Sequence, residues 1–395
     1  MTAVALIDTA ERRARLVARQ LRMRAGSVAS VADDLVGLHA SDPVTVFLSL
    51  RARLAGFEPS GFEAAVYDER AVVRMLGMRR TMFVVPPGLA AVMDAACTRA
   101  LAPAERRRLE TAVAEQGLSA EPRVWLEEIA ERVLDHLDVR GAATAVELTK
   151  AVPELGLKLV MATGKPYEAK VGISTRLLFL LAAEGRVVRA RPLGTWLSSQ
   201  YRWARTENWL GGPLDTWEPA AARTELVRRW LTTFGPGTLE DLKWWTGWPL
   251  GQTRAAIDAV SAVAVDLEDG GIGWVLPGDE AVGGDEPAAG AQPVLLPSLD
   301  PTTMGWKGRD WYLGSHRGEL FDRNGNAGPT IWCAGRIVGG WAQRDDGEVA
   351  IEILDDVGTE VEASVVAEAE RIQRWLGDVR FRTRFPTPLE QRLRS

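Results

Sequence analysis

Hydrophobic and polar residues in the first quarter of the chain follow helical spacing and then strand-like spacing. Residues 8–24 form an amphipathic helical pattern, and Ser27 suits the N-cap of a second helix. Asp42, followed by proline, predicts the start of a third helix, since both residues favour these positions. A short helical stretch at 61–68 precedes the β-branched run ERAVVRMLGMRRTMFVVPP, which favours a strand pair. Three helices followed by a hairpin indicate a winged helix.

The same order of helices and hairpin recurs twice further along the chain. The second copy has helical patterns at 126–137, from Thr144 onward and at 172–185, then alternation with a turn at Pro192–Gly194 over 186–204. The third copy has them at 224–235, from Thr238 onward and at 250–263, then a hairpin pattern over 263–278. In such helix-turn-helix variants the third helix usually enters the major groove of DNA.

The last third of the chain differs from the rest in composition and in the spacing of its apolar residues. Residues 279–293 are acidic and rich in Gly, Ala and Pro, which indicates a loop or linker. Residues 294–362 favour mainly β structure, with period-two alternation in PTIWCAGRIVGGWAQ around a turn at Ala334–Gly335, and a helix over 363–377 precedes a basic tail. The predicted fold class is therefore α+β, with tandem winged helix-turn-helix repeats and a C-terminal β-rich, barrel-like domain. The predicted domains are 1–118, 119–205, 206–280 and 294–395, the first three being winged helices.

The composition of the chain indicates its cellular compartment. No stretch approaches the roughly 18 uncharged apolar residues that a membrane span needs. The N-terminus has no basic segment before its apolar run, unlike a signal peptide. Only Cys97 and Cys333 are present, which argues for a reducing compartment and against a disulfide scaffold or structural zinc site. We therefore expect a cytoplasmic protein without membrane contact.

The charge pattern leaves two interpretations open. The net charge of −6 counts against nucleic-acid binding, but only six of the 47 basic residues are lysines. Arginine is the better residue for bidentate phosphate contacts. The arginines form clusters at 12–24, 106–108 and 186–191. Each cluster suits either a phosphate-binding patch or a solvated helix face balanced by local acids.

Four segments, in order along the chain, carry a family resemblance. LVGLHASDPVTVFLSLRARL (35–54), MRRTMFVVPP (78–87), LLPSLDPTTMGWKGR (295–309) and FDRNGNAGPTIWCAGRIVGGW (321–341) resemble elements of the AlkZ-like DNA glycosylase family. The corresponding family patterns are LVGLQAQDP, an MRGT-type strand, LLPxFDPxxLGYxxR and RNGxxxPTVLVDGRVVGxW. The resemblance implies tandem winged helices that hold duplex DNA on a concave, positive surface, with no metal or other cofactor.

The resemblance also implies a site. The family's Gln-x-Gln motif flanks the nucleobase excision site, and its two glutamines correspond to His39 and Ser41. Purines alkylated at N7 or N3 carry positive charge, so the enzyme must chiefly position a water and stabilise an oxocarbenium-like centre. Histidine could orient that water and accept its proton, while Ser41 could hold it. In the alternative interpretation, His39 interacts with a helix dipole and Ser41 assists a turn. Asp42 is explained by capping alone.

Further candidates would contact DNA. Arg79, Arg80 and Thr81 match the family hairpin and could bind phosphates, although a salt-bridged wing explains them equally well. Turns of the C-terminal segment hold four more candidates, Lys307, Arg323, Asn324 and Arg336, for which turn chemistry is the alternative. The three histidines are too scattered to predict a metal site. The tryptophans, Trp306 and Trp311 included, fit core positions better than base stacking.

The sequence therefore predicts a monofunctional, metal-independent DNA glycosylase that excises alkylated purines from duplex DNA. Bulky genotoxin adducts are one possible substrate, because self-resistance is a role that some family members serve. The alternative is a non-catalytic winged-helix DNA binder, such as a lesion sensor or transcription regulator, which the missing glutamines favour. Against it, no dimerisation helix is visible, so a monomer is expected. A protein-interaction module is a third possibility, supported only by the acidic net charge.

Overall fold

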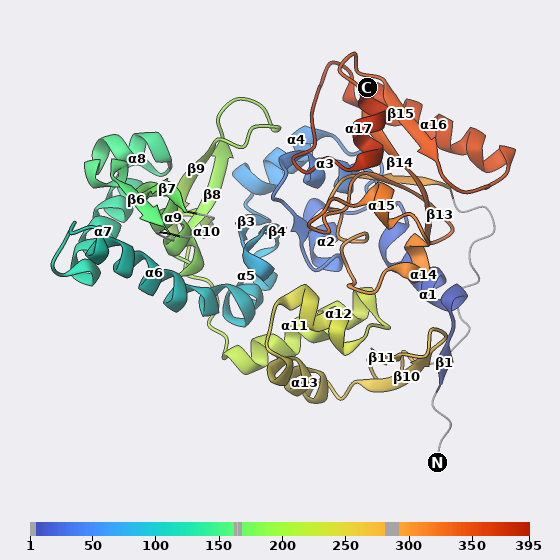
Figure 1. Ribbon diagram of the computed structural model, residues 1–395, viewed down its shortest axis with the longest axis horizontal. Coiled ribbons are helices and arrows are strands. Elements are labelled where there is room, and N and C mark those ends of the chain that lie inside the picture. The colour runs from blue at the N-terminus through green and yellow to red at the C-terminus, as the bar shows by residue number, and fades with distance from the viewer. Residues whose placement is uncertain (1–4, 162–163, 165–167, 281–291) are drawn as a thin grey trace. The chain divides into compact units, whose positions relative to one another are not determined.

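The computed structural model describes residues 5–161, 164, 168–280 and 292–395, and the chain divides into two compact units (Figure 1). Unit 1 comprises Met1–Phe62 and Thr224–Ser395, and unit 2 comprises Glu63–Arg223. The predicted α+β class is confirmed. The four-domain division stays a prediction, since the two units are a coarser division. Most of the predicted linker at 279–293 lies outside the described residues.

Unit 1 contains two sheets and most of the helices that flank the sequence motifs. Its helices are α1 (Thr9–Leu16), α2 (Val28–Asp34), α3 (Pro43–Arg51), α12 (Leu239–Thr246), α13 (Leu250–Ala259), α14 (Asp310–Leu313), α15 (Arg317–Leu320), α16 (Thr359–Leu376) and α17 (Pro388–Arg394). Its strands are β1 (Leu6–Ile7), β2 (Leu38–His39), β10 (Val263–Leu267), β11 (Ile272–Val275), β12 (Val294–Leu296), β13 (Thr330–Cys333), β14 (Arg336–Gln343) and β15 (Val349–Ile353). Two helices cross the boundaries between the units, α4 (Pro59–Glu63) and α11 (Pro219–Phe234).

Side-chain caps begin the helices where the sequence predicts them. Ser27 accepts a hydrogen bond from the Ser30 amide at the start of α2, in a reciprocal capping box. Asp42 caps α3, whose first residue is proline. Thr144 and Thr238 form capping boxes at the starts of α8 (Ala145–Ala151) and α12. The predicted N-caps at Ser27 and Asp42 are confirmed, and the helices predicted from Thr144 and Thr238 begin where expected.

The C-terminal sheet is open rather than closed. Its strands follow the order β12-β13-β14-β15, all antiparallel, and β12 and β15 are not paired with each other in the described part of the chain. The barrel-like part of the prediction is therefore wrong. The physical reason is that β12 pairs over only three residues, while α16 and α17 pack against β15 and β14. The predicted turn at Ala334–Gly335 is confirmed, with φ of 47° and 76°.

Unit 2 surrounds one hydrophobic core. Its helices are α5 (Pro87–Met93), α6 (Ala102–Glu115), α7 (Pro122–Arg140), α8, α9 (Ile173–Ala183) and α10 (Thr206–Leu210). Its strands are β3 (Val73–Leu76), β4 (Met82–Val85), β5 (Ala143–Thr144), β6 (Lys158–Met161), β7 (Ala169–Gly172), β8 (Val187–Pro192) and β9 (Tyr201–Arg205). The strands β4-β3-β8-β9-β5 are neighbours in one sheet, and apolar faces of α6, α7 and α9 share the core.

Two strand pairs have no counterpart among the predictions. β1 pairs parallel with β10, joining Leu6 to Asp266, and β6 pairs antiparallel with β7. The predicted hairpins at β3–β4, β8–β9 and β10–β11 are present as antiparallel pairs. Among the described residues, no helix is long and apolar enough to cross a membrane.

Candidate active site and nucleic-acid interface

His39 and Ser41 lie on a loop of unit 1 that begins with an unusual turn. After α2, the amide of Val36 donates to the carbonyl of Asp33 (3.0 Å), and that of Gly37 donates to Ala32 (2.7 Å). This is a helix C-cap in which Val36 takes the left-handed position, with φ of 52°. A β-branched residue there costs about 1–2 kcal/mol. Val36 is fully buried, so packing holds the turn that leads into β2 and the half-buried His39.

The other end of this loop is held by Asp42. Its buried carboxylate accepts hydrogen bonds from the amides of Val44 (3.3 Å) and Arg384 (3.0 Å). The carbonyl of the half-buried Ser41 also accepts a hydrogen bond from Nη1 of Arg384 (3.3 Å). Asp42 therefore caps α3, as predicted, and also anchors the C-terminal tail to the loop. Arg384 was not among the residues predicted from the sequence, where the basic tail was its only signal.

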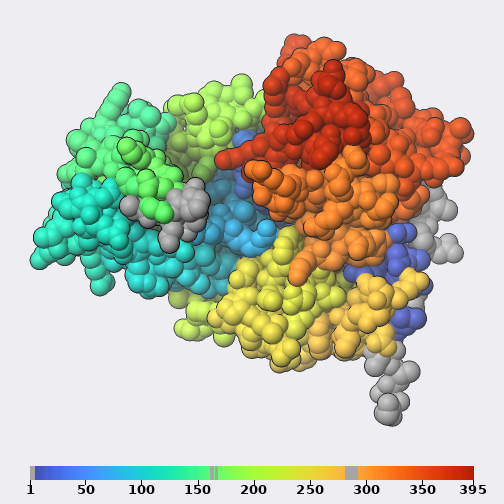
Figure 2. Space-filling view, in the orientation of Figure 1, coloured from blue at the N-terminus to red at the C-terminus, as the bar shows by residue number. Residues whose placement is uncertain are grey.

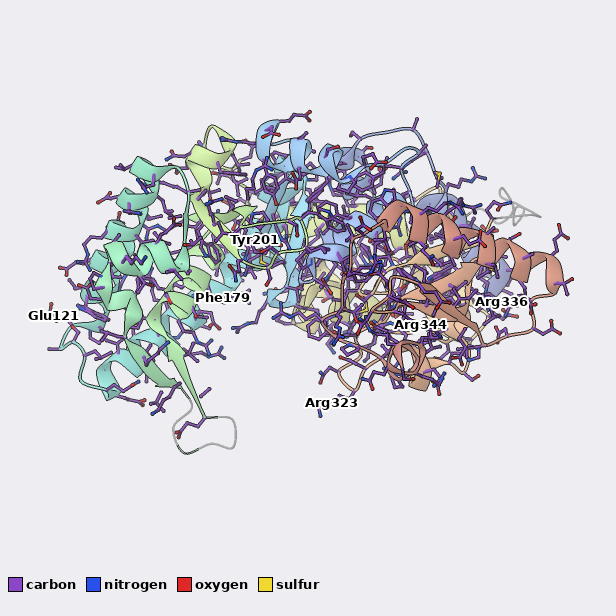
Figure 3. All side chains as sticks on the ribbon, turned by 90° about the horizontal axis from the view of Figure 1, so that it is seen from above. Glu121, Phe179, Tyr201, Arg323, Arg336 and Arg344 are labelled. Carbon is purple, nitrogen blue, oxygen red and sulfur yellow. The ribbon has the colours of Figure 1, made fainter. Side chains whose placement is uncertain are left out.

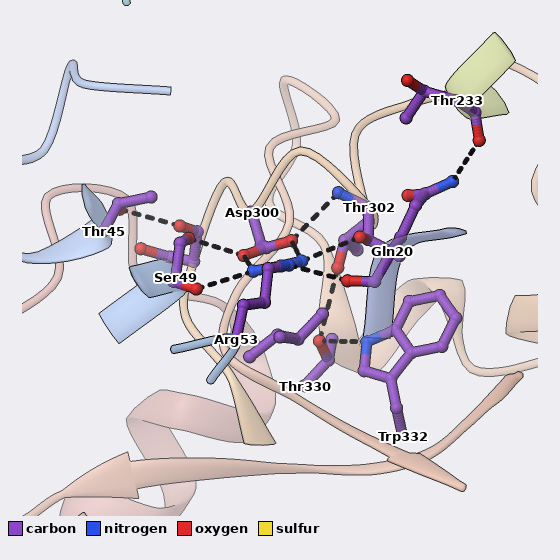
Figure 4. A network of polar contacts seen from close by, with 12 residues as sticks. Gln20, Thr45, Ser49, Arg53, Thr233, Asp300, Thr302, Thr330 and Trp332 are labelled. Atoms are coloured by element: carbon purple, nitrogen blue, oxygen red, sulfur yellow. Dashed lines mark hydrogen bonds and ion pairs between the residues drawn. The ribbon is translucent and has the colours of Figure 1, made fainter. Parts of the chain in front are cut away.

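Behind the loop, α3 is fixed by a buried ion pair (Figure 4). Arg53 and Asp300 are 1% and 0% exposed, and Nη2 of Arg53 lies 2.7 Å from Oδ1 of Asp300. Asp300 also accepts hydrogen bonds from Ser49 Oγ (2.5 Å) and the Thr302 amide (2.9 Å). The guanidinium fills its remaining donor positions with the carbonyls of Gln20 and Ser49 and the Thr302 hydroxyl. Every charge in this network is therefore hydrogen-bonded.

The network joins two of the sequence motifs. Residues 35–54 contribute Ser49 and Arg53, and residues 295–309 contribute Asp300 and Thr302. Thr45 Oγ1 adds a bond of 2.8 Å to the Ser298 carbonyl. The segment that carries His39 and Ser41 is thus attached to a segment about 250 residues away. Arg53 lies two residues beyond the end of α3, and the sequence pattern alone gave no signal for its pairing with Asp300.

The tail beside Asp42 contains a second buried acid, Glu390. Burial raises the pKa of Glu390, and the nearby Asp42 carboxylate adds to this effect. The hydrogen bond from the Thr383 hydroxyl, the charge of Arg394 and the hydrogen bond from the Thr387 amide lower the pKa of Glu390. The balance favours a protonated carboxyl relative to an exposed glutamate. Figure 2 shows the C-terminal residues, in red, at the surface of unit 1.

Arg79, Arg80 and Thr81 form the tip of the β3–β4 hairpin in unit 2. Arg79 and Arg80 both adopt positive φ, of 52° and 64°, in a tight turn that usually contains Asn-Gly. Arg80 pairs with Glu105 (2.6 Å) and lies 4.9 Å from the ring centre of Phe179, which is labelled in Figure 3. The Thr81 hydroxyl donates to the carbonyl of Met78 (2.8 Å). The pairing of Arg80 matches the salt-bridged alternative, whereas two exposed arginines in strained positions favour a function at this tip.

In unit 1, the structure brings Lys307 and the turn holding Arg323 and Asn324 into one neighbourhood. The buried Arg309 connects them, since its Nη1 donates to the carbonyl of Gly325 (3.4 Å). Lys307 is half exposed and lies 3.2 Å from Glu240. Arg323 is exposed at the edge of the unit (Figure 3) and forms no ion pair with a described residue.

The Asn324 turn is organised by Asp322. Burial opposes ionisation of Asp322, but hydrogen bonds from Asn326, Asn324 and Gly325 together lower the pKa of its carboxyl. The amide of Asn324 donates to Oδ1 of Asp322 at 2.8 Å. This geometry corresponds to the turn chemistry that the Asn-Gly sequence predicts, and it leaves the exposed Asn324 side chain at the surface.

Arg336 belongs to a different group of residues. It pairs with Asp355 (2.5 Å), which also lies 2.7 Å from Nε2 of His316. Figure 3 shows Arg336 well apart from Arg323. The predicted DNA-binding residues of unit 1 therefore do not form a single cluster.

Most of the clustered arginines are paired with acids. Arg15 and Arg19 bind Asp279, Arg106 binds Glu127 and Glu184, and Arg186 binds Glu127 and Glu131. The arginines of these clusters therefore mainly form ion pairs within the protein. Trp306 is buried and its Nε1 donates to the carbonyl of Phe234 (3.0 Å), so it belongs to the core. In the described part of the chain, no group of three or more His, Cys, Asp or Glu side chains is arranged to hold a metal ion.

Comparison with known proteins identifies the class. The sequence model of the family described as "DNA glycosylase AlkZ-like" matches residues 32–375. The structure is similar to that of Streptomyces sahachiroi DNA glycosylase AlkZ, with a TM-score of 0.72 and 20% identity over 96% of this chain and 99% of that one. No curated protein matched the sequence. The family places this chain among the DNA glycosylases, which hydrolyse N-glycosyl bonds. The chain belongs to the AlkZ-like family.

Proposed function

We propose that this protein hydrolyses the N-glycosidic bond of purines alkylated at N7 or N3 in duplex DNA. His39 orients the attacking water and accepts its proton, and Ser41 holds the water by its hydroxyl. The observation that carries this proposal is the loop geometry. Both residues are partly exposed and lie on one loop. The buried Val36 turn holds the start of this loop, Asp42 holds its end, and the Arg53–Asp300 pair lies just beyond α3, the helix that follows it.

The positive charge of the substrate explains why an imidazole and a hydroxyl are sufficient for base excision in this proposal. An N7- or N3-alkylated purine is already a good leaving group, so protonation of the base is unnecessary. The protein has to supply a correctly placed water and a rigid frame. The buried ion pair and the double anchoring of Asp42 supply such a frame for the loop. In this proposal the reaction is monofunctional and needs no metal ion.

The proposal includes a DNA-binding surface on each unit. In unit 2 it is the hairpin tip with Arg79, Arg80 and Thr81, and in unit 1 it includes Lys307, Arg323, Asn324 and Arg336. These residues would contact phosphates and groove edges. We further infer that the protein acts as a cytoplasmic monomer. Bulky adducts made by a genotoxic natural product are the substrates that would give it a self-resistance role.

The test is base release from a duplex that carries one N7-alkylguanine, measured under single-turnover conditions. His39→Ala is expected to slow release about 100-fold, the effect of losing a general base. His39→Gln restores the family residue and is expected to keep more activity than alanine, since it still orients water. His136→Ala is the matched control, because His136 is a half-buried histidine on α7 of unit 2.

Three other outcomes are informative. Unchanged release by His39→Ala would keep the glycosylase and reject this site. No release from any adduct, together with tight salt-sensitive binding, would favour a non-catalytic DNA binder. Binding to DNA that is weak and insensitive to salt would instead favour a protein-interaction module.

A further inference from the structure

Arg384 is an exposed arginine of the C-terminal tail that lies next to the proposed excision loop. It falls outside residues 32–375, the part of the chain that the family model matches. We propose that its guanidinium binds a backbone phosphate of the DNA strand beside His39 and Ser41 and so positions the nucleotide whose base is released. This inference rests on the proposed function, because it needs duplex DNA as the substrate.

The guanidinium of Arg384 has fewer hydrogen-bond partners than that of Arg380, and no acidic partner like that of Arg382. Arg380 donates to the carbonyls of Gly377 and Asp346, and Arg382 pairs with Asp345 at 2.6 Å. Arg384 forms no ion pair with any residue that the structure describes. Its one hydrogen bond from the guanidinium goes to the Ser41 carbonyl (3.3 Å), a neutral acceptor. The Asp42 carboxylate binds the main-chain amide of Arg384, and the guanidinium itself forms no ion pair with a described residue.

A guanidinium has five N–H donors, so most of the donors of Arg384 remain available for a ligand. Their planar arrangement fits two oxygens of a phosphate. DNA backbone phosphates are the anions that a glycosylase must meet on both sides of the excised base. In a chain with a net charge of −6, a cation that has no acidic partner is best suited to such a contact.

The main chain fixes where this guanidinium can reach. The amide of Arg384 donates to Oδ2 of Asp42 (3.0 Å), the same carboxylate that caps α3. The preceding residue, Thr383, is buried and its hydroxyl donates to Glu390. The side chain therefore starts from a fixed point beside Ser41, which lowers the ordering cost of binding a phosphate. Arg384→Ala removes the side chain beyond Cβ, including the guanidinium, but keeps the amide that binds Asp42.

The experiment measures the affinity of the full-length protein for an undamaged duplex as a function of salt. The slope of log K against log salt is negative, and loss of one phosphate contact makes it less steep by about 0.9. This corresponds to about eightfold weaker binding at 0.1 M salt. We expect this change for Arg384→Ala and little change for Arg384→Lys, which keeps the charge. Arg382→Ala is the matched control, since Arg382 is an exposed arginine in the same tail that already has an acidic partner.

The second measurement is base release at subsaturating N7-alkylguanine duplex, which we expect to fall for Arg384→Ala by about the same factor as affinity. A slope equal to that of Arg382→Ala would overturn the proposal, and so would an Arg384→Lys variant as weak as alanine. A reduced slope with undiminished release would reject the positioning role. If the wild type releases no base from any duplex, the proposed function fails, while the salt slopes still decide whether Arg384 binds phosphate.

Discussion

Replacing Arg53 by methionine tests whether the buried ion pair holds the loop-bearing segment in place. Methionine keeps much of the length and apolar volume of the stem but removes all five hydrogen bonds of the guanidinium. Asp300 would keep two donors, the Ser49 hydroxyl and the Thr302 amide. Its charge would then be buried at 0% exposure without a counterion.

The expected cost follows from that uncompensated charge. Removing one partner of a buried pair typically destabilises a protein by about 3–5 kcal/mol. Arg53→Met combined with Asp300→Leu should recover much of this loss, because no lone charge remains. Arg51→Met is the matched control, since Arg51 is the last residue of α3 and lies two positions before Arg53. Its partner Glu368 is 13% exposed and keeps a second cation, Arg371 (2.6 Å), so we expect a smaller cost of about 1 kcal/mol.

The assay combines urea unfolding, followed by tryptophan fluorescence, with hydrogen exchange of peptides. Trp332 is 1% exposed and bonds to Thr330 close to the network, so unit 1 contributes to the fluorescence signal. Exchange should accelerate in peptides from α3 and from residues 295–305, while peptides from α7 in unit 2 act as the internal reference. Equal losses for Arg53→Met and Arg51→Met, or a double variant less stable than Arg53→Met, would refute the reasoning.

Two further predictions concern the hairpin tip and the C-terminal tail. Arg79→Gly relieves a left-handed residue, so the free energy of unfolding of unit 2 should rise by up to about 1 kcal/mol while affinity for duplex DNA falls; unchanged affinity would remove Arg79 from the interface. Burial raises the pKa of Glu390 above its ordinary value near 4.5, so its proton stabilises the folded state most at low pH. That stabilisation is lost as pH rises through the folded pKa. Glu390→Gln cannot ionise, so its stability relative to wild type should increase from pH 5 to pH 8, and parallel pH profiles would contradict this.

Local signals in the sequence predicted much of the fold. The N-caps at Asp42 and Thr144 and the turn at Ala334–Gly335 depend on residues within four positions of one another, and the structure confirms them. Contacts between distant segments were not predictable in this way. The two residues of β1 have no periodicity, yet they pair with β10 about 260 positions away. The closed barrel was wrong because alternation predicts strands but not whether the edge strands meet.

The candidate site was likewise predicted only in part, because local motifs were visible in the sequence and contacts between distant segments were not. The motif resemblance indicated His39 and Ser41. Asp42 was predicted only as a helix cap, because capping was enough to explain it from the sequence. Its second partner, Arg384, lies 342 residues away, and only the folded chain brings the two together. The pairing of arginines such as Arg186 with Glu127 likewise required the structure, since composition fitted paired and unpaired arginines equally well.

The insertion of unit 2 between the two parts of unit 1 has a consequence for biosynthesis. Arg53 emerges from the ribosome 247 residues before Asp300, its only acidic partner among the residues described. At about 5–20 residues per second, the N-terminal segment waits roughly 12–50 s for that partner. Unit 2, which is continuous in sequence, can fold in this interval, whereas Arg53 must remain without its counterion. Truncated nascent chains should therefore protect Glu63–Arg223 from protease before they protect residues 5–62.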